Sequence, residues 1–121
     1  MPVVLVAEDD AAIRKLICAI VRKQGVDVVT ASDGAEAIAH ARSAPFDALL
    51  LDLMMPNESG WEVMEQLTAQ QSPLLAKTVV ITAASDREIG QLPERARIIR
   101  KPFDLRELVR TLRETVGMPA D

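Results

Sequence analysis

Several reactive side chains in this 121-residue sequence stand at or just after the ends of short apolar runs. The residues are Glu8, Asp9 and Asp10 after residues 3–7, Asp52 after residues 48–51, Thr82 after residues 79–81, and Lys101 shortly after residues 98–99. If each run is a strand of one open parallel sheet, these side chains lie at its carboxyl edge, where such sheets bind ligands. Carboxylates, a hydroxyl and an ammonium group at one edge predict a site for a divalent cation and a phosphoryl group.

The carboxylates Glu8, Asp9 and Asp52 have the chemistry of a magnesium site. Mg²⁺ prefers oxygen ligands and is usually held by one or two carboxylates together with phosphate oxygens. Asp52 is also a candidate nucleophile, because a carboxylate can form an aspartyl-phosphate. The cation and Lys101 would supply the positive charge that phosphoryl transfer needs, and Thr82 would supply a hydroxyl donor. The alternative is that the first acids cap a helix and that Asp52 lies in a turn.

The hydrophobic periodicity predicts the elements that position these residues. Continuous apolar runs indicate strands buried on both faces, and apolar residues at helical spacing indicate helices between them. The predicted strands are residues 3–7, 26–29, 47–51, 78–82 and 97–100, and the predicted helices begin near residues 11, 34, 61, 85 and 104. This β-α alternation, repeated five times, predicts an α/β fold with a doubly wound parallel sheet in a single domain over residues 1–121.

The composition is typical of an ordinary globular protein, with 49% hydrophobic and 26% charged residues. A formal net charge of −4 gives no general reason to expect nucleic-acid binding. The single Cys18 excludes an internal disulfide and fits a reducing compartment. No signal peptide is visible, and no apolar run approaches the ~20 residues that span a bilayer. We therefore expect a cytoplasmic protein that contacts neither nucleic acid nor membrane directly.

The chain resembles a two-component response-regulator receiver domain, of the CheY-like superfamily, from end to end. The motifs that carry the resemblance are VLVAED at residues 4–9, DLMMP at residues 52–56, Gly60, Thr82-Ala83 and Lys101-Pro102-Phe103. Each motif is weak alone, but their order and spacing together are highly specific. The resemblance implies a flavodoxin-like (βα)5 sheet in the strand order 2-1-3-4-5, in which the switch point lies between strands 1 and 3.

The resemblance also implies a role for each site residue. Asp52 matches the phosphoacceptor, which takes a phosphoryl group from the phosphohistidine of a kinase. Glu8 and Asp9 match the acidic pair around Mg²⁺ (or Mn²⁺), and Met54 matches the position whose backbone carbonyl is a further ligand. Thr82, Ala83 and Lys101 match the switch and phosphoryl-binding residues. The bond between Lys101 and Pro102 matches the cis peptide bond of the family. In this pattern Asp9 is the more direct ligand, and Glu8 often acts through water.

A domain of this kind catalyses only its own phosphorylation and dephosphorylation and is not an enzyme with turnover. Its implied partners are a histidine kinase or histidine phosphotransfer protein, and an unknown output partner or domain. Phosphorylation would alter the protein surface that meets this output partner. We expect a monomer or a phosphorylation-dependent dimer.

Some positions depart from the pattern that the resemblance implies. The residue three positions before the lysine, usually aromatic, is Ile98. A switch must therefore work through backbone movement after the fourth strand or through an aliphatic side chain. The helix near residues 85–92 is weakened by Gly90 and Pro93, and we expect it to be short or mobile. Met54 and Ala84 hold the positions that govern the dephosphorylation rate in relatives. Neither can orient an attacking water by hydrogen bonding, so we expect slow self-dephosphorylation.

The sequence is also compatible with two other functions. A degenerate receiver would act only as a constitutive interaction module, although every phosphorylation residue is present. A phosphatase of the haloacid-dehalogenase type also uses an aspartate nucleophile at a strand end, but it needs a second aspartate where this chain has Met54. A nucleotide-binding function is disfavoured because the chain lacks a glycine-rich phosphate loop.

Overall fold

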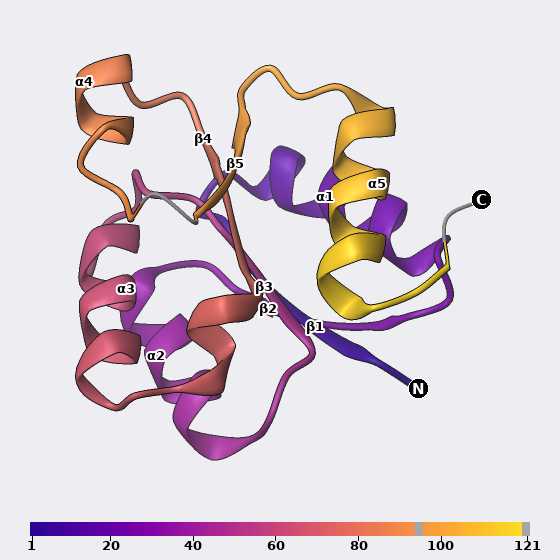
Figure 1. Cartoon of the computed structure of the whole chain (residues 1–121), viewed down its shortest axis with the longest axis horizontal. Helices are drawn as coiled ribbons and strands as arrows, with labels where there is room; N and C mark the ends of the chain where they lie inside the picture. The colour runs from indigo at the N-terminus through magenta and orange to yellow at the C-terminus, as the bar shows by residue number, and fades with distance from the viewer. Residues whose placement is uncertain (94–95, 120–121) are drawn as a thin grey trace.

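The computed structural model describes residues 1–93 and 96–119, which form a five-stranded sheet between two layers of helices (Figure 1). The strands are β1 (Val3–Ala7), β2 (Asp27–Ala31), β3 (Ala48–Leu51), β4 (Thr78–Thr82) and β5 (Arg97–Arg100). The helices are α1 (Ala11–Arg22), α2 (Gly34–Ser43), α3 (Gly60–Ala69), α4 (Asp86–Ile89) and α5 (Leu105–Val116), with a 3₁₀ helix η1 (Pro73–Lys77) before β4. No helix in the described residues is both long and apolar enough to cross a membrane.

All strand pairs are parallel, and their order in the sheet is β2-β1-β3-β4-β5. This confirms the predicted α/β class, the doubly wound sheet and the strand order. The predicted second strand began at residue 26, whereas β2 runs from Asp27 to Ala31, because it pairs with β1 from Val3 to Ala7. The predicted domain end at residue 121 lies outside the described residues.

The sheet separates two hydrophobic cores, one under α1 and α5 and one under α2, α3, η1 and α4 (Figure 1). Successive side chains of a strand point to opposite faces. Val4 and Val6 therefore pack toward α1 and α5, whereas Leu5 and Ala7 pack toward the other layer. Each large apolar side chain buried in this way contributes about 1.5–3 kcal/mol. The double burial holds the strand ends, and hence the reactive residues, in fixed positions.

Polar side chains fix the points at which the helices begin. The N-cap side chains are Asp10 for α1, Asp33 for α2, Ser59 for α3, Ser85 for α4 and Asp104 for α5, and each accepts a hydrogen bond from the first turn. Among the acids after β1, only Asp10 is therefore used as a cap. Its oxygen Oδ1 accepts from the Ile13 amide at 3.0 Å, and Glu8 and Asp9 remain for the site.

Helix α4 is a single turn of four residues, Asp86–Ile89, so the prediction of a short helix is confirmed. A capping box between Ser85 and Glu88 starts it, and Gly90 ends it. The mobility of this helix stays a prediction. The sequence reasoning did not predict η1, whose signals are the Ser72 side chain accepting from the Leu74 amide and a proline in the first turn.

Candidate functional site

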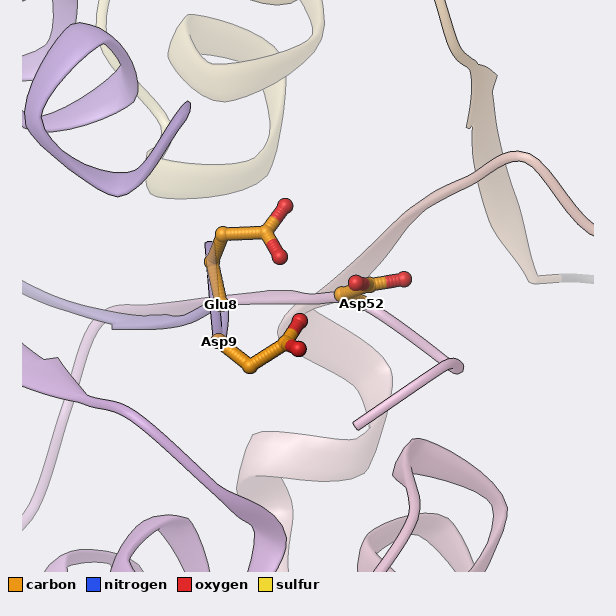
Figure 2. Close-up of side chains that lie close together, drawn as sticks. All are labelled: Glu8, Asp9 and Asp52. Carbon is orange, nitrogen blue, oxygen red and sulfur yellow. The ribbon is translucent and has the colours of Figure 1, made fainter. Parts of the chain in front are cut away.

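The acidic residues meet because β1 and β3 are neighbours with Ala7 paired to Leu51. The next residues, Glu8 and Asp52, therefore lie side by side, and the Asp52 amide donates to the Ala7 carbonyl at 3.0 Å. One carboxylate oxygen from each of Glu8, Asp9 and Asp52 lies within 4.8 Å of the other two. Figure 2 shows the Glu8 and Asp9 side chains projecting from the end of β1 toward Asp52. The predicted acid cluster thus exists in the fold.

Lys101 brings the positive charge of the site. Its ammonium Nζ lies 2.5 Å from Glu8 Oε1 and 3.3 Å from Asp52 Oδ2. The backbone of the lysine is held at the end of β4, because its amide donates to the Thr82 carbonyl at 2.9 Å. The bond between Lys101 and Pro102 is cis. The expected cis peptide bond is therefore present. Glu8 and Asp52 are only 2% and 5% exposed, and Lys101 compensates two buried carboxylates.

Each oxygen of the Asp52 carboxylate has its own donor. Oδ1 accepts from the Met54 amide at 3.1 Å, and Oδ2 accepts from Lys101. The start of α3 packs directly on this residue, because a Cβ at Gly60 would lie 2.3 Å from the Asp52 carbonyl oxygen. Only glycine allows this approach, which explains Gly60 among the motif residues. The Asp52 side chain is therefore fixed in orientation before any ligand arrives.

The charges in the cluster shift each other's ionisation. Burial raises the pKa of Glu8, and Asp52 raises it further, while Lys101 opposes both effects. Burial and the neighbouring Glu8 raise the pKa of Asp9. Burial alone would lower the pKa of Lys101, but Glu8 and Asp52 outweigh it, so the net direction is upward. Lys101 is therefore charged at neutral pH. The acids crowd negative charge in a way that a cation would relieve.

The donor set fits a small divalent cation. In an octahedral shell at about 2.0–2.1 Å, opposite oxygen ligands lie about 4 Å apart. The oxygens of Glu8, Asp9 and Asp52 lie within 4.8 Å of one another, so the side chains would have to move closer together to share such an ion. Asp9 is exposed to solvent while Glu8 is buried against Lys101, so Asp9 is the more accessible candidate ligand.

Thr82, at the end of β4, is fully buried. Its hydroxyl Oγ1 accepts a hydrogen bond from the Ala84 amide at 3.1 Å. The exposed Ala83 lies beside Lys101, where the two residues help to line an apolar pocket of about 450 Å³ together with Ile13, Leu16, Pro102 and Phe103. The hydroxyl and the lysine thus come from neighbouring strand ends, β4 and β5, as the sequence predicted.

Ile98 occupies the position where an aromatic ring was expected. It is partly buried and packs against the core under α2, α3 and α4. Two residues further along β5, Arg100 forms an ion pair with Asp86 of α4. The short α4 is therefore tied to β5 by charge, in addition to the burial of Ile89 and Leu92.

The sequence reasoning missed Arg14. Its guanidinium Nη1 donates to the backbone carbonyls of Glu8 at 2.8 Å and Asp9 at 3.2 Å, and so holds the segment that carries both acids. No motif marks this arginine. The only signal is its place in the first turn of α1, from which a long side chain can reach back over the preceding loop.

Comparison with known proteins agrees with the class that this fold and site define, an open parallel sheet with an acidic ligand site at its switch point. Residues 4–113 match the family model described as the response regulator receiver domain. The chain therefore belongs to the response regulator receiver domain family. The resemblance predicted from the motifs is confirmed. Proteins of this class signal through phosphorylation.

Individual relatives show how much of a longer protein the chain represents. It is 30% identical over 121 residues to the sensory transduction protein RegX3 of Mycolicibacterium smegmatis, covering 100% of this chain and 53% of the relative. It is 31% identical over 110 residues to the DNA-binding response regulator MtrA of Mycolicibacterium paratuberculosis, covering 91% of this chain and 49% of the relative. The chain thus spans about half the length of these curated relatives.

A solved structure supports the same class. The receiver domain of the sensor histidine kinase PA1611 from Pseudomonas aeruginosa, described with a magnesium ion coordinated in the active-site cleft, superposes with a TM-score of 0.83. The two sequences are 27% identical over 96% of this chain and 98% of that chain. The name of MtrA refers to DNA binding, so the expectation that this protein makes no direct contact with nucleic acid has no support from its relatives.

Proposed function

We propose that this receiver accepts a phosphoryl group onto Asp52 from a histidine kinase or a histidine phosphotransfer protein, in a Mg²⁺-dependent reaction in the cytoplasm. The observation that carries the proposal is the state of Asp52. Its carboxylate is buried at the sheet edge, each oxygen has a separate donor, and two further acids and a lysine surround it. A solvated turn residue would not need such an environment.

In the proposed phosphoryl transfer, Asp52, Lys101 and Thr82 have separate roles. A carboxylate oxygen of Asp52 forms a bond to phosphorus while the bond from phosphorus to the imidazole nitrogen breaks, and the electron pair leaves with the imidazole. Lys101 then exchanges its contact with Asp52 for a phosphoryl oxygen. Thr82 can donate to another oxygen, because its Oγ1 accepts from the Ala84 amide and no hydrogen bond donated by its hydroxyl is found within the described residues. These steps are mainly positioning and charge stabilisation.

Glu8, Asp9 and Asp52, with the backbone carbonyl of Met54, would hold the cation. When bound, Mg²⁺ supplies positive charge to the phosphoryl oxygens and to the crowded carboxylates. Mn²⁺ has the same preference for carboxylate, carbonyl and water oxygens and is the alternative ion. The magnesium named in the PA1611 receiver structure is in line with this choice.

We infer that the phosphorylated form is long-lived. The Met54 side chain is 55% exposed beside Asp52 and carries no hydrogen-bonding group except a weakly accepting sulfur. Ala84 carries no polar side chain at all. Neither residue can orient a water for attack on the acyl phosphate, so self-dephosphorylation is slow.

The conformational change would pass from the site to the protein surface without the rotation of an aromatic side chain, because the expected aromatic position is Ile98. Thr82 moving toward the phosphoryl group would carry the backbone between β4 and α4, whose only turn is linked to β5 by the Arg100–Asp86 ion pair. Ile98 would fill the space released behind Thr82. An output partner or domain would then recognise the changed surface, with the protein acting as a monomer or as a phosphorylation-dependent dimer.

The test is incubation with Mg²⁺ and a small acyl-phosphate donor, followed by mass spectrometry of the intact protein. We expect a phosphate adduct on the parent protein that is absent from Asp52→Asn and from the parent treated with a chelator. No adduct on the parent would favour the degenerate receiver. Turnover of phosphate esters would favour the haloacid-dehalogenase type, which the exposed Met54 at the position of its second aspartate argues against.

A further inference from the structure

The loop after the phosphoacceptor, residues 53–59, is tied at its middle to the start of α2. The Asn57 side-chain amide Nδ2 donates to Asp33 Oδ2 at 2.8 Å, across 24 residues of sequence. Asn57 has a backbone φ of 62°, in the left-handed region that asparagine tolerates better than most residues. A side-chain contact thus fixes a residue whose backbone conformation is itself unusual.

Asp33 serves two partners at once, one with each oxygen. Oδ1 accepts from the Glu36 amide at 2.8 Å and caps α2, while Oδ2 accepts from Asn57. These hydrogen bonds hold the pKa of Asp33 below its usual value, so the carboxylate is ionised at neutral pH. Serine or threonine has one oxygen, and asparagine has one accepting oxygen. Each of them could cap the helix, but none could also accept from Asn57 through a second oxygen.

The packing around this contact shows how closely the loop meets α2. A Cβ placed on Gly34 would lie 1.6 Å from the Glu58 carbonyl oxygen, so the loop backbone rests directly on the first residue of the helix. At its other end the loop closes through the Gly60 amide, which donates to the Leu53 carbonyl at 3.0 Å. Between these two points, the hydrogen bond from Asn57 to Asp33 links the loop to α2 through side chains.

The same loop carries Met54, whose amide donates to Asp52 Oδ1 and whose carbonyl is the implied backbone ligand of the cation. We propose that Asp33 and Asn57 are positioning residues for the phosphoacceptor site: their contact holds the 53–59 loop so that the Met54 backbone faces Asp52 and the cation. The proposal rests on the proposed function and adds two residues to it. Neither residue touches the reacting atoms, and their effect passes through Met54.

The contact lies at the solvent-exposed surface, so its effect on global stability is small. Its effect on the site is larger, because outer-shell partners that orient metal ligands typically change metal affinity by about 10–100-fold. The contact between Asn57 and Asp33 is exposed and lies three residues from Met54, so its effect should fall at the lower end of this range. We therefore expect the affinity for Mg²⁺ to be about tenfold weaker when the contact is lost.

The experiment uses the full chain and Mg²⁺ alone as the probe. Binding of Mg²⁺ is measured by titration calorimetry. D33S keeps the cap but has no second oxygen to accept from Asn57. N57D sets two carboxylates against each other, and N57G removes the tie while tolerating the positive φ. The double variant D33N/N57D restores a donor and an acceptor in reversed order. Ser32→Ala, beside the tie but outside it, is the matched control.

We expect the three single variants to bind Mg²⁺ about tenfold more weakly. Amide hydrogen exchange across residues 53–59 should be faster in them, and their melting temperatures should stay close to the parent. The double variant should recover both affinity and protection. If the contact were purely structural, its loss would lower the melting temperature, and the affinity for Mg²⁺ measured well below that temperature would not change. Unchanged exchange at Met54 in D33S and N57G, or failure of the double variant to recover, would overturn the proposal.

These readouts need no phosphoryl donor, so they separate this proposal from the proposed function. Failure of Asp52 to take a phosphoryl group, with altered exchange at Met54 and recovery in the double variant, would refute only the proposed function. An adduct on Asp52 that forms equally fast in the parent and in the single variants, with unchanged exchange, would refute only the positioning role.

Discussion

Replacing Lys101 by methionine should expose how much the buried acids depend on one cation. Lys101 is the partner of Glu8 and of Asp52, which are 2% and 5% exposed. Breaking a buried ion pair by removing one partner typically costs about 3–5 kcal/mol. The Lys101 side chain keeps 16% of its surface in water, so we expect a smaller loss in unfolding free energy of about 2 kcal/mol at neutral pH without divalent ions.

The loss in K101M should depend on pH in a definite direction. Burial and Asp52 raise the pKa of Glu8, and Lys101 is what opposes this rise. Without the lysine the folded-state pKa of Glu8 moves further above its unfolded value, so the folded protein binds a proton more tightly than the unfolded chain does. Stability relative to the parent therefore recovers as the pH falls through the folded pKa toward the unfolded one.

The assay is urea denaturation of the parent, K101M and the control K77M at neutral and mildly acidic pH, with and without Mg²⁺. Lys77 is exposed and no salt bridge involving it is found in the described residues, so K77M should match the parent. Mg²⁺ should stabilise K101M, since an ion that binds only the folded state adds RT ln(1 + [Mg²⁺]/Kd). A K101M loss that is absent, or the same with and without Mg²⁺ and at both pH values, would refute charge compensation of the buried acids by Lys101.

Three further experiments address the site and the core. Met54→Asn should shorten the lifetime of the phosphorylated form several-fold, because the new amide can orient a water; equal decay of the two phosphoproteins after donor removal would contradict this. Gly60→Ala should lower the unfolding free energy by about 1–3 kcal/mol, because the added Cβ would clash with the Asp52 carbonyl oxygen. The control is Gly90→Ala, whose added Cβ would have no neighbouring atom closer than 3.4 Å, so thermal melts should show little change in its stability. Cys18 is buried and burial raises the pKa of its thiol, so iodoacetamide should modify it quickly only after unfolding; rapid labelling of the native protein would show that α1 opens.

The sheet was predictable because its strands are buried on both faces and therefore appear as continuous apolar runs. The ends of β2 were less certain, since Val26 is apolar and buried but lies before the first pair with β1. Helix η1 was not predicted, because a five-residue turn held by Ser72 has no hydrophobic period to detect. Short elements of this kind depend on their tertiary surroundings more than on their own pattern.

The acid cluster was predictable because a carboxylate that follows a parallel strand lies at the carboxyl edge whatever its side-chain rotamer. The contacts that tune the site were not. Arg14 reaches Glu8 and Asp9 by a long flexible side chain, and Asn57 meets Asp33 only because the strand order brings two loops together. Such contacts depend on three-dimensional placement that no spacing in the sequence encodes.

The contact between Lys101 and Glu8 joins residues that are 93 positions apart in the chain. During synthesis, Glu8 and Asp52, which follow β1 and β3, emerge well before the lysine that neutralises them. A nascent chain lacks the finished site until β5 has been made and has joined β4. If the proposed function holds, a phosphoryl donor that meets an incomplete chain would find an acceptor without its lysine, and phosphorylation would favour molecules that have finished folding.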